Sequence, residues 1–103
     1  MAEVSLGKAD LKDGEHRCAV AKGRKLALAN IGGNFFCIDS ACTHAGGPVC
    51  EGKIGEKSPS SVTCPWHGSI FDYKNGKVLK GPALDPLKSY KVKVKNGELF
   101  IDI

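Results

Sequence analysis

The sequence has no apolar run that approaches the ~20 residues of a transmembrane helix, although 42% of its 103 residues are hydrophobic. Met1-Ala2-Glu3-Val4 lacks the basic-then-apolar pattern of a secretory signal. There is also no internal repeat, no low-complexity segment and no apolar pattern with the period of a helix. These absences argue against a membrane or secreted protein. We therefore expect a single cytoplasmic domain over residues 1–103.

Aromatic residues are few, at 7% of the chain, and none lies within the alternating stretch Lys91 to Lys95. The net charge of +4 comes from fifteen basic and eleven acidic residues, and Lys91, Lys93 and Lys95 alternate with apolar residues near the end. This alternation is typical of the solvated face of a strand. Without aromatic side chains for base stacking, we expect no nucleic-acid partner.

Two further absences concern catalysis. The chain has no glycine-rich nucleotide fingerprint and no recognisable set of two histidines and a carboxylate for a mononuclear iron. We therefore expect a carrier or a binding module rather than an enzyme.

Short strands separated by turn residues dominate the sequence, so we predict an all-β fold, an antiparallel sandwich or barrel. The predicted strands cover residues 16–20, 25–31, 35–39, 61–63, 69–73, 77–79, 90–94 and 98–103. Residues 40–87 hold most of the prolines and many of the glycines. We expect them to form a small subdomain inserted into a base made of residues 1–39 and 88–103.

Two motifs combine sulfur and nitrogen ligands: Cys42-Thr43-His44 and Cys64-Pro65-Trp66-His67. Two cysteines and two histidines can hold either a tetrahedral zinc ion or an unsymmetrical iron–sulfur cluster. Structural zinc sites usually pair like residues, as in Cys-x₂₋₄-Cys and His-x₃₋₅-His. The mixed pairs in this chain favour the cluster, and a zinc-stabilised interaction module remains the alternative.

The residues around these motifs resemble the two cluster-binding loops of Rieske-type ferredoxins. They are Cys-Thr-His-Ala-Gly-Gly-Pro (42–48) and Cys-Pro-Trp-His-Gly-Ser-Ile-Phe-Asp (64–72), and the resemblance continues through Lys-Gly-Pro-Ala (80–83). It implies one [2Fe–2S] cluster per chain, with Cys42 and Cys64 on the inner iron and His44 and His67 on the outer one. It also implies that the cluster lies at the tip of the inserted subdomain.

The resemblance implies a role near the cluster for three more residues. Ser69 matches a hydroxyl that donates to the cluster in high-potential relatives, or else it caps its own turn. Pro82 matches a loop that covers the cluster, or else it makes an ordinary turn. Trp66 either shields the cluster or packs beneath the insertion, and it stands where those relatives have a disulfide-forming Cys. Because Phe71 replaces a second hydroxyl donor, we expect a potential in the lower or middle part of roughly −150 to +300 mV.

Three cysteines and one histidine lie outside the motifs. We expect Cys18 and Cys37 to be small buried hydrophobic residues, Cys50 to be a loose thiol and His16 to lie on the surface. An odd number of cysteines is unremarkable in a reducing compartment.

A cluster of this kind moves one electron and binds no substrate. The resemblance therefore implies a soluble carrier, which we expect to be a monomer. Its partners would be redox proteins, a reductase as donor and a terminal oxygenase or a similar enzyme as acceptor. The alternative of a different class is the small Rieske subunit of a nitrite-reductase-type complex.

Overall fold

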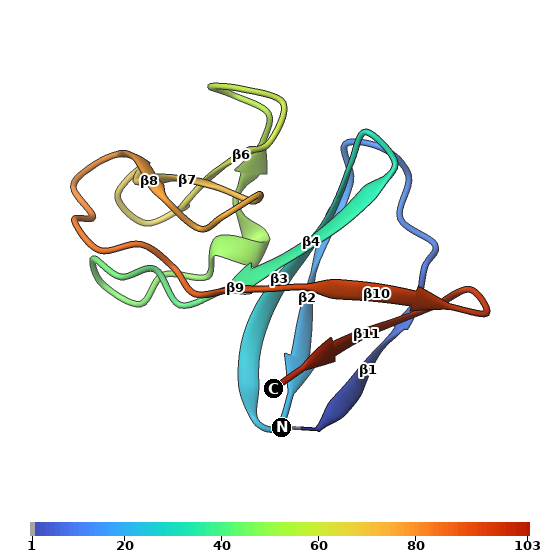
Figure 1. Ribbon diagram of the computed structural model, residues 1–103. Helices are drawn as coiled ribbons and strands as arrows, with labels where there is room; N and C mark the ends of the chain where they lie inside the picture. The colour runs from blue at the N-terminus through green and yellow to red at the C-terminus, as the bar shows by residue number, and fades with distance from the viewer. Residues whose placement is uncertain (1) are drawn as a thin grey trace.

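The computed structural model describes residues 2–103 as three antiparallel sheets (Figure 1). Its elements in chain order are β1 (Glu3–Lys8), β2 (His16–Ala21), β3 (Arg24–Ile31), β4 (Asn34–Asp39), the 3₁₀ turn η1 (Val49–Glu51), β5 (Lys53–Ile54), β6 (Ser61–Thr63), β7 (Ile70–Asp72), β8 (Val78–Lys80), β9 (Ser89–Tyr90), β10 (Val92–Lys95) and β11 (Glu98–Asp102). The prediction of an all-β fold is confirmed. Within the described residues, no helix is long and apolar enough to cross a membrane.

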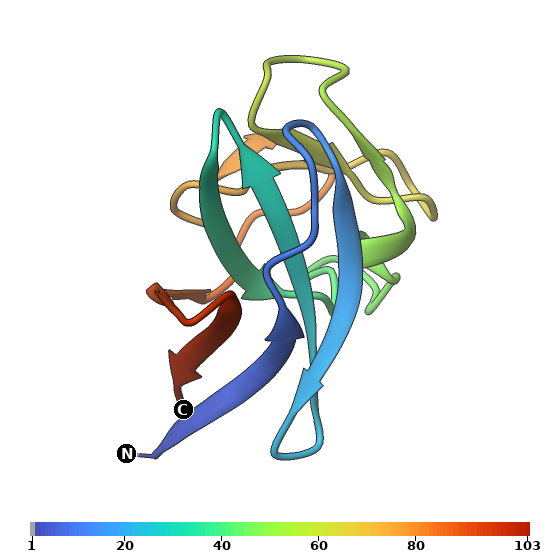
Figure 2. The same ribbon diagram turned by 90° about the vertical axis from the view of Figure 1, so that its right-hand side faces the viewer.

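Two of the sheets pack together, with strand orders β1-β11-β10 and β2-β3-β4-β9. The chain passes from the second sheet to the first at Lys91, between β9 and β10. Figure 2 shows β1 and β11 side by side near the two termini, where they pair in antiparallel register. Asn96 and Gly97 turn the chain between β10 and β11 with φ values of 51° and 74°. This left-handed conformation suits the predicted Asn-Gly hairpin turn.

Strand β3 is buried on both faces. Leu26 and Leu28 face a core that we call the base core, whereas Ala27 and Ala29 face a second core, the cluster-side core. The base core also contains Leu6, Ala21, Cys37, Tyr90, Leu99 and Ile101. Because one face of β3 carries only small side chains, the neighbouring sheet can approach it closely.

The third sheet, with order β5-β6-β7-β8, is an antiparallel meander over residues 53–80. It lies to one side of the other two sheets (Figure 1). Its largest buried side chains, Phe71 and Tyr73, are fully covered in the cluster-side core together with Val49 and Val62. This packing fixes the loops that leave β4 and β6, and those loops carry the two Cys/His motifs.

Candidate metal centre

The first Cys/His motif lies in a tight loop that follows β4, residues 42–47, which we call the first ligand loop. The backbone N–H of Cys42 donates to the carbonyl of Gly47 at 2.9 Å, and the N–H of Gly46 donates to the carbonyl of Cys42 at 2.7 Å. Gly46 has a φ of 75°, a conformation that glycine adopts without steric cost. These bonds hold Cys42 and His44 on one short, closed segment.

The second ligand loop, residues 64–69 between β6 and β7, repeats this backbone arrangement. The N–H of Cys64 donates to the carbonyl of Ser69 at 2.7 Å, and the N–H of Gly68 donates to the carbonyl of Cys64 at 3.1 Å. Gly68 has a φ of 78°, matching Gly46 at the same offset from the cysteine. The two loops therefore share one backbone hydrogen-bond pattern, and each carries one thiol and one imidazole.

The two cysteine side chains form an inner pair. Cys42 and Cys64 are only 4% and 2% exposed, and both side chains belong to the cluster-side core. Burial raises the pKa of the Cys64 thiol, the backbone N–H of Trp66 opposes this by stabilising the thiolate, and the Cys42 thiol raises the pKa further. A bound metal would displace the proton, because thiols ligate as thiolates.

The two histidine side chains form an outer pair. His44 and His67 are exposed, and their ring centroids lie 4.8 Å apart with the planes at 85°. Among residues 2–103, no three His, Cys, Asp or Glu side chains gather around a single point. A structural zinc ion takes four protein donors at one point, whereas each iron of a mixed-ligand [2Fe–2S] centre takes two. One pair of thiols and one pair of imidazoles fit the second arrangement.

The two ligand loops touch at Gly47. A Cβ atom at this position would lie 2.7 Å from Cys64 Sγ and 3.0 Å from Cγ of Trp66. The backbone of the first loop therefore lies directly against the sulfur and the indole of the second. Trp66 is 57% exposed, which favours the first of its two possible roles, shielding of the cluster, over packing beneath the insertion.

Residues 81–85, which we call the proline loop, are tied to both ligand loops. Ser69 Oγ accepts a hydrogen bond from the N–H of Ala83 at 3.0 Å, and Thr43 Oγ1 donates to the carbonyl of Asp85 at 2.6 Å. Ser69 is fully buried. It bonds to a residue 14 positions away rather than capping its own turn, and its hydroxyl proton is left to donate elsewhere. Pro82 lies in this loop, directly before Ala83.

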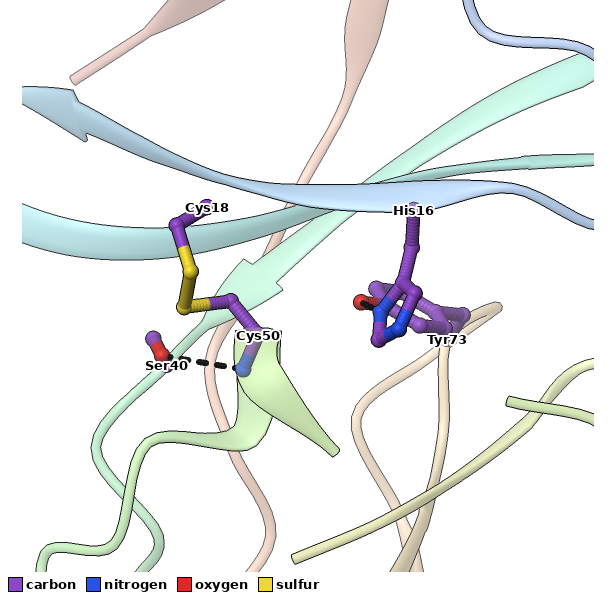
Figure 3. Close-up of a disulfide and its surroundings, with 5 residues drawn as sticks. All are labelled: His16, Cys18, Ser40, Cys50 and Tyr73. Carbon is purple, nitrogen blue, oxygen red and sulfur yellow. Dashed lines mark hydrogen bonds between the residues drawn. A yellow bond between two sulfur atoms is a disulfide. The ribbon is translucent and has the colours of Figure 1, made fainter. Parts of the chain in front are cut away.

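Two cysteines outside the motifs form a disulfide that we did not predict. Cys18 of β2 bonds to Cys50 of η1, with their Cα atoms 4.8 Å apart (Figure 3). The expectations that Cys18 is buried and that Cys50 is a loose thiol are both wrong, because Cys18 is exposed on β2 and is bonded to Cys50. Cys37 is buried as expected, and burial is the main cause that raises its pKa to about 12.

His16 is half-buried rather than on the surface, so that prediction is also wrong. Its Nδ1 lies 2.7 Å from the hydroxyl oxygen of Tyr73, and the two rings meet edge to face (Figure 3). Burial lowers the pKa of the imidazole, and a hydrogen bond with the backbone of Gly52 partly offsets this. His16 therefore joins β2 to the segment after β7.

Residues 3–91 match the family model described as the Rieske [2Fe-2S] domain. The chain belongs to this family. It is 38% identical over 95 residues to the 3-phenylpropionate/cinnamic acid dioxygenase ferredoxin subunit of Shigella flexneri serotype 5b (strain 8401), covering 92% of this chain and 87% of the relative. The predicted Rieske resemblance is confirmed.

Solved structures agree with this assignment. The Sphingomonas yanoikuyae B1 ferredoxin superposes with a TM-score of 0.88 at 29% identity, and the match covers 99% of each chain. A chain from the complex of reduced oxygenase and oxidized ferredoxin in carbazole 1,9a-dioxygenase superposes with a TM-score of 0.87 at 28% identity, covering 96% of this chain and 91% of that one. This Rieske-family chain is an electron carrier with a Rieske-type [2Fe–2S] cluster and not itself the catalyst.

Proposed function

We propose that this Rieske ferredoxin receives single electrons from a reductase and delivers them to the terminal oxygenase of a dioxygenase system. The observation that carries the proposal is the 38% identity to the ferredoxin subunit of such a system. The same similarity favours the oxygenase partner over the nitrite-reductase alternative. We further propose that the protein acts as a monomer in the cytoplasm.

Within this function, Cys42 and Cys64 would hold the inner iron, and His44 and His67 the outer iron. The burial of the thiol pair and the exposure of the imidazole pair support this division. When bound, such a cluster supplies reversible one-electron transfer. The backbone N–H groups of Trp66 and His67 are directed at the Cys64 sulfur and stabilise negative charge on it, which favours the reduced state.

The exposed end of the molecule around His44 and His67 is the proposed docking surface. Trp66 of the second ligand loop and Leu84 of the proline loop are exposed apolar side chains, with exposed fractions of 57% and 91%. A small surface of this kind suits a weak, transient redox contact. We also propose the division into a base (1–39 and 88–103) and a cluster-binding subdomain (40–87). The separate sheet over residues 53–80 supports it.

The ligand assignment can be tested by metal content and electron paramagnetic resonance. The anaerobically purified protein should contain iron and inorganic sulfide and, after dithionite reduction, give a spectrum of mixed nitrogen and sulfur ligation. Cys42→Ser and Cys64→Ser should lose the cluster, whereas the matched control Cys37→Ala should keep it, because Cys37 lies in the base core. Zinc without sulfide in the native protein would refute the proposal.

The outer ligands and the partner need separate measurements. His67→Cys should lower the reduction potential, because a thiolate adds negative charge beside the outer iron; an unchanged or higher potential would refute the role of His67. For the partner, the reduced protein should transfer electrons faster to the oxygenase component of 3-phenylpropionate dioxygenase than to a sirohaem nitrite reductase. The reverse order would favour the alternative function.

A further inference from the structure

The Cys18–Cys50 disulfide connects the base to the segment that forms the cluster-binding loops. Cys18 belongs to β2, and Cys50 lies in η1, 32 residues later (Figure 3). Cys50 also follows Gly47 by only three residues, and Gly47 is the position where the first ligand loop presses on Cys64 Sγ. A covalent bond at Cys50 therefore restrains the loop that shapes the metal centre.

The segment around Cys50 has other anchors that do not depend on the disulfide. The N–H of Cys50 donates to Ser40 Oγ at 3.2 Å, and the N–H of Val49 donates to the carbonyl of Ser40 at 2.9 Å. The Val49 side chain is fully buried in the cluster-side core. Opening the disulfide should therefore loosen the first ligand loop without unfolding the domain.

The disulfide is open to small molecules. Both cysteines line an open groove of about 440 Å³, and Cys18 itself is exposed. Lys25 and Glu51 both line this groove, so it carries no net charge that would exclude an ionised thiol, and Trp66 of the second ligand loop lines it as well. A small thiol can thus reach Cys18 in the folded protein.

The compartment gives a second, independent reason to expect exchange. Disulfides are rare in the cytosol of mesophiles, and those that occur there are usually transient, either catalytic or redox-sensing. This step rests on the cytoplasmic location in the proposed function. The exposed position of this disulfide beside a metal-binding loop is typical of a redox-sensing disulfide, whereas a structural disulfide is usually buried.

We propose that Cys18–Cys50 is a thiol-exchange site for low-molecular-weight thiols of the glutathione class, and that its opening loosens the hold on the cluster. A glutathione thiolate attacks Cys18 Sγ, which forms a mixed disulfide and breaks the bond to Cys50, and Cys50 leaves as a thiolate. A second glutathione thiolate attacks the glutathione sulfur of the mixed disulfide and releases Cys18. The protein disulfide gains two electrons, two glutathione molecules become one oxidised glutathione, and their two protons pass to the two cysteines.

The exchange step can be tested by intact mass after thiol blocking. The cluster-loaded protein is incubated anaerobically at defined ratios of reduced to oxidised glutathione. Its free thiols are then alkylated, and the intact mass is measured. We expect the native protein to start with the disulfide closed and to gain two blocked thiols as the ratio rises. Cys50→Ser should accumulate a glutathione adduct on Cys18, and Cys18→Ser should accumulate less on Cys50, because Cys18 is the more exposed residue.

The coupling to the metal centre needs a second readout, the rate at which a chelator bleaches the visible absorption. Reduced glutathione should accelerate bleaching of the native protein on the order of tenfold, because such a cross-link commonly shifts the folding equilibrium by more than that factor. The Cys18→Ser/Cys50→Ser double variant should bleach at the fast rate with or without glutathione. Matched Cys37→Ala protein should behave like the native chain.

Three results would overturn this inference. These are free thiols at both positions in the purified protein, a disulfide that stays closed in fully reduced glutathione, or equal bleaching rates of the open and closed forms. Failure of the proposed function is a distinct result, because a chain without iron and sulfide still reports exchange by mass. Only the bleaching rates require the cluster.

Discussion

Gly47→Ala tests the most demanding packing contact of the metal centre. Gly47 does not have a positive φ, so alanine is compatible with the backbone. A new Cβ would nevertheless lie 2.7 Å from Cys64 Sγ, whereas ordinary van der Waals contact begins at 3.4 Å. The sulfur of a metal ligand cannot retreat without weakening its bond, so the first ligand loop itself must move by about 0.7 Å.

The sign of the change in unfolding free energy shows whether Gly47 is free of close contacts or tightly packed. If Gly47 were free of close contacts, alanine would stabilise the fold by about 0.4–1 kcal/mol, because it restricts the unfolded chain. Overpacking instead costs roughly 1–3 kcal/mol. The structure therefore predicts a net loss of about 1–2 kcal/mol, together with reduced cluster content.

The assay combines iron and sulfide content, the rate of bleaching by a chelator, and denaturant unfolding. Gly81→Ala is the matched control, because a Cβ there would meet only ordinary contacts at 3.8 Å. We expect the control to retain native iron content. A Gly47→Ala protein with native iron content and equal or greater stability would refute the contact between the two ligand loops.

Three further predictions follow from single contacts. Ser69→Ala should lower the reduction potential, measured by redox titration, by about 30–60 mV and leave the iron content unchanged. This shift equals ~0.7–1.4 kcal/mol, the contribution of a hydrogen bond that is stronger in the reduced state. No shift would show that the hydroxyl does not reach the cluster. Because burial lowers the pKa of His16 from its ordinary 6.5, the unfolded chain binds the proton more readily. The free energy of unfolding should therefore fall as pH drops below 6.5. His16→Gln should reduce this fall, measured by urea unfolding at pH 7.5 and 5. An unaltered pH dependence in the variant would show that His16 does not cause the fall. Cys37, with a pKa near 12, should resist iodoacetamide at pH 8 in the folded protein, and rapid alkylation there would contradict its burial.

The predicted strands depend on local patterns, and most of them are present. The β3–β4 and β10–β11 hairpins were predictable because apolar alternation and Gly or Asn-Gly turns lie within a few residues of each other. Strand β1 was missed. A bulge between Ser5 and Gly7 interrupts its alternation, and its partner β11 comes from the opposite end of the chain.

The four candidate ligands were predictable for a related reason. Each motif carries one thiol and one imidazole within three or four residues, so the chemistry can be read without knowing the fold. The equivalence of the two loops was less visible, because it depends on Gly46 and Gly68 at the same offset from each cysteine. That shared offset was present in the sequence and could have been used.

The errors at His16 and Cys18 run in opposite directions: His16 was expected on the surface and is half-buried, and Cys18 was expected to be buried and is exposed. The two residues are two positions apart in β2 and therefore share a face, while Ala19 and Ala21 on the other face pack against the base core. Local pattern alone does not reveal that cluster-side residues meet this face. His16 reaches Tyr73 and Cys18 reaches Cys50, so both contacts join β2 to the segments that shape the metal centre. The small side chains of Ala27 and Ala29 on β3 belong to the cluster-side core as well. A face that mixes alanine, histidine and cysteine on adjacent strands is thus better explained by contact with a second sheet than by water.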